Sequence, residues 1–217
     1  MKQFDLIVFD WDGTLVDSTG HIAKSIQNSY ADNALPVPDD SAAKHVIGLG
    51  LVDTFNYLSP NLSKTQHAGI VDRYRHHFLN LDKTIYPFKN VLKGLEELAE
   101  RGYFLAVATG KSREGLDRAL EKVDFGHFFS VTRCGDEGFP KPNPDMLNHI
   151  MDDLGVIPER TLMIGDTTHD LNLAANAGAK SLAVTCGAHE IDQLMAVESL
   201  AYLQSFDEVI EWLKKNG

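Results

Sequence analysis

Residues 4–17 read FDLIVFDWDGTLVD, a short apolar stretch followed at once by an acidic octapeptide. The apolar part is rich in β-branched and aromatic side chains and leads into an Asp-Gly pair, which predicts a buried strand followed by a turn. Because side chains alternate along an extended segment, Asp10 and Asp12 project the same way. Two such carboxylates on apolar backing need a cation or a shared proton. Mg²⁺ suits them, as does a division of labour between nucleophile and acid/base.

Five later stretches have the same strand-like composition, and helical patterns separate them. The predicted strands are residues 103–108, 128–133, 161–165, 181–184 and 200–203. The predicted helices are residues 91–101, 113–123, 145–154, 171–177 and 206–214. This alternation predicts an α/β fold, a doubly wound, Rossmann-like parallel sheet covered by helices.

The segment between the first two strands departs from this alternation. It contains no convincing strand pattern and predicts four helices, at residues 18–31, 40–46, 51–58 and 63–81. The economical interpretation is an α-helical cap inserted into the α/β core. We predict a catalytic core of residues 1–16 and 84–217 and a cap of residues 17–83.

The second predicted strand runs into Thr109-Gly110-Lys111-Ser112 and then into a helix. The Gly-Lys-Ser part resembles the end of a nucleotide-binding P-loop, but that motif needs a glycine where Leu105 stands. What remains is a hydroxyl with backbone N–H groups at a helix N-terminus, which suits a phosphoryl oxygen. A simple capping role for Thr109 or Ser112 is the alternative.

Two further strands are also followed by charged residues. Lys141 stands between two prolines, which restrict the backbone and so hold its ammonium group in place. Asp166 and Asp170 follow the strand at residues 161–165, although Asp170 alone could merely complement a helix dipole. The carboxyl ends of parallel strands meet at one edge of a sheet, where doubly wound folds bind ligands. We therefore predict a metal-assisted phosphoryl-transfer site at that edge.

Composition limits the possible partners. The chain has 217 residues and a formal net charge of −11. This acidic balance argues against binding to nucleic acid or to anionic membranes, which needs an excess of Lys and Arg. The start of the chain does not resemble a signal peptide, there is no long apolar run, and Cys134 and Cys186 form no metal-binding pair. We expect a cytoplasmic monomer or homodimer whose anionic substrate is attracted by local charges.

The motifs resemble those of the haloacid dehalogenase superfamily, specifically its phosphatases with an inserted helical cap, such as phosphoglycolate phosphatase. The resemblance spans essentially the whole chain and rests above all on residues 10–17 and on the GDxxxD segment at residues 165–170. It implies a Mg²⁺-dependent hydrolase of small phosphorylated metabolites that acts through an aspartyl-phosphate. The presence of Asp12 excludes the dehalogenases, which lack this second aspartate.

The resemblance also implies the roles of the catalytic residues. Asp10 would be the nucleophile, and Asp12 would protonate the leaving oxygen and then deprotonate the attacking water. Thr109 and the backbone of Gly110 would bind the transferring phosphoryl group. Lys141 would neutralise the charge of that group and of Asp10.

By the same resemblance, four aspartates would surround the metal. Asp10, the backbone carbonyl of Asp12, and Asp166 would hold Mg²⁺, with Asp170 in the ligand shell or directly behind it. The inserted helices would form a lid that excludes water and reads the leaving group. Residues 47–50, IGLG, could reach the substrate from the lid, or could be a plain turn between two helices.

Several other functions remain open at this stage. A sugar phosphomutase of the β-phosphoglucomutase type would return the phosphoryl group to another hydroxyl of its substrate. A nucleotidase or a pyrophosphatase would use the same scaffold. A signalling receiver domain places its acid pair and its phospho-acceptor on separate strands, and a non-catalytic binding module would have lost a motif residue. No cap residue identifies the substrate.

Overall fold

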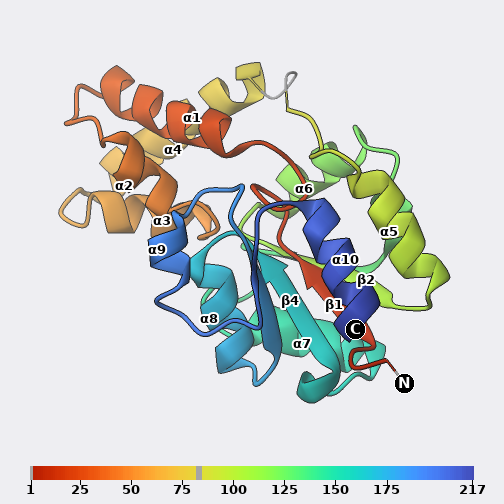
Figure 1. Cartoon of the computed structure of the whole chain (residues 1–217). Helices are drawn as coiled ribbons and strands as arrows, with labels where there is room; N and C mark the ends of the chain where they lie inside the picture. The colour runs from red at the N-terminus through yellow and green to blue at the C-terminus, as the bar shows by residue number, and fades with distance from the viewer. Residues whose placement is uncertain (1, 82–84) are drawn as a thin grey trace.

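The computed structural model describes residues 2–81 and 85–217. Within them, a six-stranded parallel sheet has the strand order β3-β2-β1-β4-β5-β6 (Figure 1). The strands are β1 (Leu6–Phe9), β2 (Phe104–Thr109), β3 (Phe129–Cys134), β4 (Thr161–Gly165), β5 (Lys180–Val184) and β6 (Tyr202–Leu203). The predicted parallel α/β fold is confirmed.

Helices cover both faces of this sheet because β1, at its centre, is apolar on both faces. Ile7 and Phe9 belong to the hydrophobic cluster on one face, and Leu6 and Val8 to the cluster on the other. The helices of the first face are α5 (Val91–Glu100), α6 (Arg113–Leu120) and α10 (Phe206–Asn216). Those of the second face are α7 (Asp145–Leu154) and α8 (Thr168–Asn176). The short α9 (Ile191–Leu194), which the pattern of apolar residues did not predict, follows β5.

Four helices lie between β1 and α5, above the carboxyl edge of the sheet in Figure 1. These cap helices are α1 (Thr19–Asp32), α2 (Asp40–His45), α3 (Leu51–Leu58) and α4 (Lys64–Leu81). They enclose a hydrophobic cluster of their own, which includes Ile26, Tyr30, Phe55 and Ile70. The predicted helical insertion is thereby confirmed. The boundary between residues 83 and 84 lies outside the described residues, and the division into core and cap stays a prediction.

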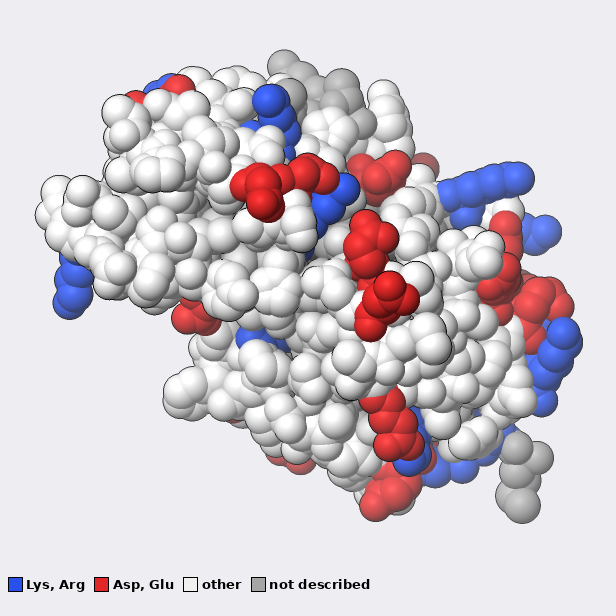
Figure 2. Space-filling view, turned by 60° about the vertical axis from the view of Figure 1, so that its left-hand side comes forward, with Lys and Arg blue, Asp and Glu red and all other residues white. Residues whose placement is uncertain are grey.

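Two features of the described residues concern nucleic-acid and membrane partners. On the face shown in Figure 2, Lys and Arg are scattered among Asp and Glu, and no continuous basic patch covers it. In the part of the chain that the structure describes, no helix is long and apolar enough to cross a membrane.

Candidate active site

Three buried carboxylates meet at the carboxyl edge of the sheet. Asp10 follows β1, Asp166 follows β4, and Asp170 lies in the first turn of α8. One oxygen of each lies within 4.8 Å of the others. Gly13 permits this approach: its φ is +87°, and a Cβ atom there would lie 2.2 Å from Oδ2 of Asp166. The turn after β1 therefore needs glycine both for its conformation and for its contact with Asp166.

Lys141 is the cation among these carboxylates, and we call the four residues the charge cluster. Its Nζ donates to Oδ1 of Asp10 at 2.7 Å and to Oδ1 of Asp170 at 2.5 Å, and its side chain is fully buried. Burial disfavours the ammonium form, but Asp10 and Asp170 outweigh burial and raise the pKa of Lys141 above its ordinary value. Lys141 therefore remains charged at neutral pH and offsets one of the three carboxylates.

The remaining negative charge fits a divalent cation. Burial raises the pKa of Asp10 to about 7 against the effect of Lys141, with contributions from neighbouring aspartates, and burial also raises the pKa of Asp166. Oδ2 of Asp10 is buried without a hydrogen-bond partner among the described residues. An unpaired buried carboxylate oxygen beside two further carboxylates is a donor set that suits Mg²⁺. The residues present therefore fit the metal that the resemblance implied.

Asp12 lies apart from the three clustered carboxylates. One of its oxygens accepts a hydrogen bond from Oγ of Ser18 at 2.6 Å, and the other lies 3.0 Å from Nζ of Lys111. Its side chain does not belong to the carboxylate group that could hold a metal, and only its backbone carbonyl was expected to do so. Nζ of Lys111 also lies 4.7 Å from the ring centre of Phe78 in α4. Lys111, considered in the sequence only as part of a P-loop, thus contacts both Asp12 and a cap helix.

The turn after β2 lies directly under the cap helices. Thr109 is buried, and its Oγ1 accepts a hydrogen bond from the backbone N–H of Lys111 at 3.2 Å. At Gly110, a Cβ atom would lie 2.4 Å from the carbonyl oxygen of Leu49 and 2.6 Å from that of Gly48. The loop of residues 47–50 therefore reaches the predicted phosphate-binding turn, and glycine at position 110 allows the two backbones to touch.

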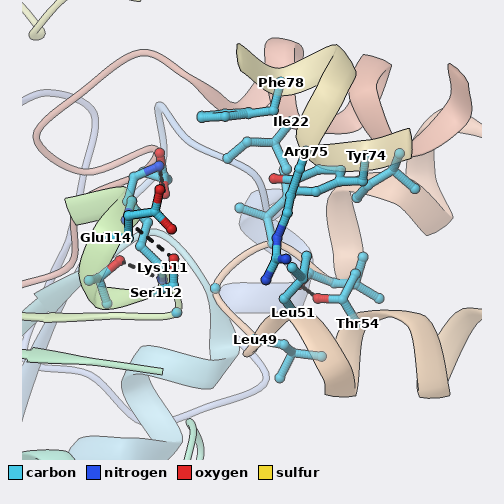
Figure 3. Close-up of a pocket in the computed structure, with 18 of the residues that line it drawn as sticks. Ile22, Leu49, Leu51, Thr54, Tyr74, Arg75, Phe78, Lys111, Ser112 and Glu114 are labelled. Atoms are coloured by element: carbon cyan, nitrogen blue, oxygen red, sulfur yellow. Dashed lines mark hydrogen bonds and ion pairs between the residues drawn. The ribbon is translucent and has the colours of Figure 1, made fainter. Parts of the chain in front are cut away.

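A cavity of about 160 Å³ separates the cap helices from the core (Figure 3). Core residues form its floor: Asp10, Asp12, Thr109, Gly110 and Lys111. The cap helices and their loops form its roof, which includes the apolar residues Ile22, Ile26, Leu49, Leu51 and Phe78 and the polar residues Thr54, Tyr74 and Arg75. The sequence did not single out these polar residues, because apolar periodicity marks α4 as packed without showing which polar side chains face inward.

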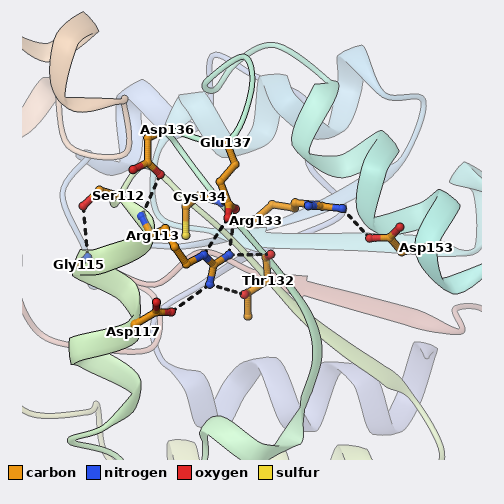
Figure 4. Close-up of polar contacts among 10 residues, drawn as sticks. All are labelled: Ser112, Arg113, Gly115, Asp117, Thr132, Arg133, Cys134, Asp136, Glu137 and Asp153. Atoms are coloured by element: carbon orange, nitrogen blue, oxygen red, sulfur yellow. Dashed lines mark hydrogen bonds and ion pairs between the residues drawn. The ribbon is translucent and has the colours of Figure 1, made fainter.

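An ion-pair network joins the turn after β2 to the segment after β3 (Figure 4). Arg113 donates to the two carboxylate oxygens of Glu137 at 2.8 and 2.9 Å and to the hydroxyl of Thr132 at 2.9 Å. Glu137 in turn accepts from the backbone N–H of Cys134 at 2.8 Å. Lys141 follows in the same segment, so this network holds the lysine-bearing loop against the turn that is predicted to bind phosphate.

Three histidines join the cap helices to the core beside the cavity. Nε2 of His169 and Nε2 of His189 lie 2.9 and 3.0 Å from the carbonyl oxygen of His45. Nδ1 of His189 accepts from the backbone N–H of Thr168, which leaves its proton on Nε2, where it is donated to His45. Burial lowers the pKa of His169 to about 4 and also lowers that of His189. Both rings are therefore neutral at pH 7.

Comparison with known proteins establishes the family. The model of the haloacid dehalogenase-like hydrolases matches residues 7–184. The chain belongs to this family. It is 35% identical over 210 residues to the probable phosphatase IndB of Dickeya dadantii, covering 94% of this chain and 91% of that protein. It is 31% identical over 212 residues to the pyrophosphatase PpaX of Oceanobacillus iheyensis, covering 96% of this chain and 92% of that protein.

A solved structure shares the same fold. The crystal structure of a predicted phosphoglycolate phosphatase from Haemophilus somnus has a TM-score of 0.84 and 25% sequence identity, covering 97% of this chain and 98% of that one. The family resemblance and the assignment to hydrolases are confirmed. The protein is a haloacid dehalogenase-like phosphatase with a buried aspartate group fit for a metal.

Proposed function

We propose that the protein hydrolyses small phosphomonoesters in a Mg²⁺-dependent reaction, through an aspartyl-phosphate formed on Asp10. The observation that carries this proposal is the carboxylate of Asp10 itself. It lines the cavity, pairs with Lys141 through one oxygen, and has no partner among the described residues for the other. The size of the cavity, about 160 Å³, favours a small substrate, because a cavity of roughly 150 Å³ holds a molecule such as benzene.

The reaction proceeds in two steps. In the first, a carboxylate oxygen of Asp10 bonds to phosphorus while the bond from phosphorus to the leaving oxygen breaks, and Asp12 protonates that oxygen. In the second, Asp12 takes a proton from water as the water attacks phosphorus, and the bond to Asp10 breaks to release phosphate. Nζ of Lys111 lies 3.0 Å from one carboxylate oxygen of Asp12 and Oγ of Ser18 donates to the other at 2.6 Å, so both contacts hold this side chain in place. Thr109 and the backbone of Gly110 bind the phosphoryl group in both steps.

The charge cluster provides the electrostatic part of the site. Asp10, Asp166 and the backbone carbonyl of Asp12 would hold Mg²⁺, with Asp170 beside or behind them. When bound, the ion would offset the charge of the carboxylates and of the phosphoryl group. Lys141 contributes a second positive charge, held in place by Asp10 and Asp170. Phosphate dianion can thus approach a carboxylate nucleophile without net repulsion.

Pyrophosphate is a second candidate substrate. It is favoured because the chain matches a pyrophosphatase over 96% of its length, at 31% identity. The same residues would act on it, since attack of Asp10 on one phosphorus would release the other phosphate as the leaving group.

Phosphate release from 4-nitrophenyl phosphate, with and without Mg²⁺, tests the proposed function. Wild type should turn over only with the metal, and Asp10→Asn should lower kcat by about 1,000-fold or more. The matched control is Asp17→Asn, which removes an exposed carboxylate of the same octapeptide and should retain activity. Urea denaturation verifies that both variants fold.

Incubation of the protein with a sugar 1-phosphate is the experiment that could contradict the proposal. Isomerisation of this compound without release of phosphate would identify a mutase instead. Full activity of Asp10→Asn would equally exclude Asp10 as the nucleophile.

A further inference from the structure

Arg75 differs from the other cations that line the cavity. Lys111 pairs with Asp12 at 3.0 Å, and Arg118 pairs with Glu114 at 2.6 Å. Arg75 has no carboxylate partner within residues 2–81 and 85–217. In Figure 3 it extends from α4 into the space between the roof and Lys111. Its positive charge is therefore available to a molecule in the cavity.

The surroundings of Arg75 strengthen its attraction for an anion. Most of the roof is apolar, and a charge acts more strongly beside apolar walls than in open water. Tyr74, its neighbour in α4, packs against Phe55 and Phe78 and also lines the cavity. The hydroxyl of Tyr74 has no hydrogen-bond partner in the described part of the chain. The roof thus offers a cation without a carboxylate partner and a hydroxyl without a hydrogen-bond partner among residues 2–81 and 85–217.

Lys141 and Arg75 would act on different parts of a bound substrate. Lys141 pairs with Asp10, a residue of the floor, and the transferring phosphoryl group would bind against that floor. Arg75 approaches from the opposite side, where the rest of the substrate must lie. A guanidinium group matches the planar geometry of a carboxylate and the oxygens of a phosphate equally well.

We propose that Arg75 determines specificity by pairing with a negative charge on the leaving group of the substrate. This inference rests on the proposed function of the site. The substrates it selects are short phosphorylated compounds with a second anionic group, either a carboxylate or a phosphate. Because the protein carries a net charge of −11, a local cation at this position also offsets the repulsion that such a substrate meets.

Two substrates of nearly the same shape isolate the effect of the charge. Phosphoglycolate carries a carboxylate where isobutyl phosphate carries an uncharged isopropyl group. Pyrophosphate is the third substrate, and its leaving group is a phosphate. Arg75→Gln should lower kcat/KM for the preferred anionic substrate by about 10- to 100-fold and for isobutyl phosphate by less than about two-fold. The matched control, Lys64→Gln, removes an exposed positive charge from the same helix outside the cavity and should change neither value.

Charge reversal separates recognition from a structural role. Arg75→Glu should favour phosphoethanolamine, whose leaving group is cationic, and raise its kcat/KM relative to phosphoglycolate by about 100-fold. A residue that only supports α4 would lower both values alike, and that result overturns the proposal.

The outcome for wild type distinguishes this proposal from the proposed function. If wild type hydrolyses isobutyl phosphate at least as well as phosphoglycolate and pyrophosphate, the role of Arg75 is wrong while the phosphatase activity stands. If wild type hydrolyses none of these compounds and no 4-nitrophenyl phosphate, both proposals are wrong.

Discussion

In the charge cluster, buried Lys141 pairs with Asp10 and Asp170, whereas the roof carries Arg75 on an apolar surface with no carboxylate partner in the described part of the chain. The three aspartates of the cluster follow β1 and β4 or lie in the first turn of α8, next to the packed sheet, and Lys141 lies in the segment between β3 and α7. The roof is built on cap helices that have a separate hydrophobic cluster. In the mechanism proposed above, the chemistry and the selection of the substrate therefore depend on different parts of the molecule, and we expect that each can be changed without the other.

Lys141→Met should have the largest effect, because it leaves Asp10 and Asp170 buried without their cation. We expect a loss of about 3–5 kcal/mol in the free energy of unfolding and loss of phosphatase activity. Urea denaturation at pH 7.5 measures the first and 4-nitrophenyl phosphate the second. Lys180→Met, at an exposed strand end, is the control and should behave as wild type.

The effect of Mg²⁺ on the stability of Lys141→Met tests whether the loss of positive charge explains the destabilisation. A divalent cation takes over part of the missing charge, so Mg²⁺ should raise the urea midpoint more in Lys141→Met than in wild type. Equal stability of the two proteins without metal would show that the cluster does not need its lysine.

Gly110→Ala should have the next largest effect, and it acts where roof and floor meet. The added Cβ atom would collide with the carbonyl oxygens of Gly48 and Leu49, so the cap helices should be displaced. We expect kcat/KM for small phosphomonoesters to fall by about 10- to 100-fold, while the urea midpoint changes little. Gly20→Ala in α1, where no atom lies within 4 Å of the new Cβ, is the control. Unchanged kcat/KM in Gly110→Ala would show that contact of residues 47–50 with this turn is not required.

The contact between His169 and His45 should produce a smaller, pH-dependent effect. The pKa of His169 is about 4 in the folded protein, below the ordinary value of 6.5, so below pH 6.5 the unfolded chain takes up a proton that the folded chain does not. Stability should therefore fall as the pH falls from 6.5 towards 4.

Urea denaturation at pH 7.5 and pH 5 checks this expectation. His169→Gln cannot take up that proton and should lose about 2 kcal/mol less than wild type over this interval. His149→Gln, at an exposed position in α7, should lose as much as wild type. The same loss in all three proteins would exclude His169 as the source of the acid sensitivity.

The boundaries of β4 and α8 show how much of the secondary structure can be predicted from neighbouring residues alone. Strand β4 occupies the predicted residues 161–165, because a short apolar run can hardly form anything else between two turns. Helix α8 begins at Thr168 and not at the predicted residue 171. Thr167 and Asp170 form a capping box, so the polar residues before the apolar pattern already belong to the helix start. Thr167 could have been recognised in the sequence as a capping residue, but apolar periodicity alone does not reveal it.

The sequence by itself determined which strands end in Asp10, Thr109 and Asp166, and parallel strand ends must share one edge of the sheet. Only the tertiary structure decided which partner each charge takes, such as Lys111 for Asp12, and that Arg75 turns into the cavity. The physical reason is the separation along the chain of the residues that determine each property. A strand and its turn are specified by neighbouring residues, whereas the inward face of α4 depends on how the cap helices pack together and onto the core.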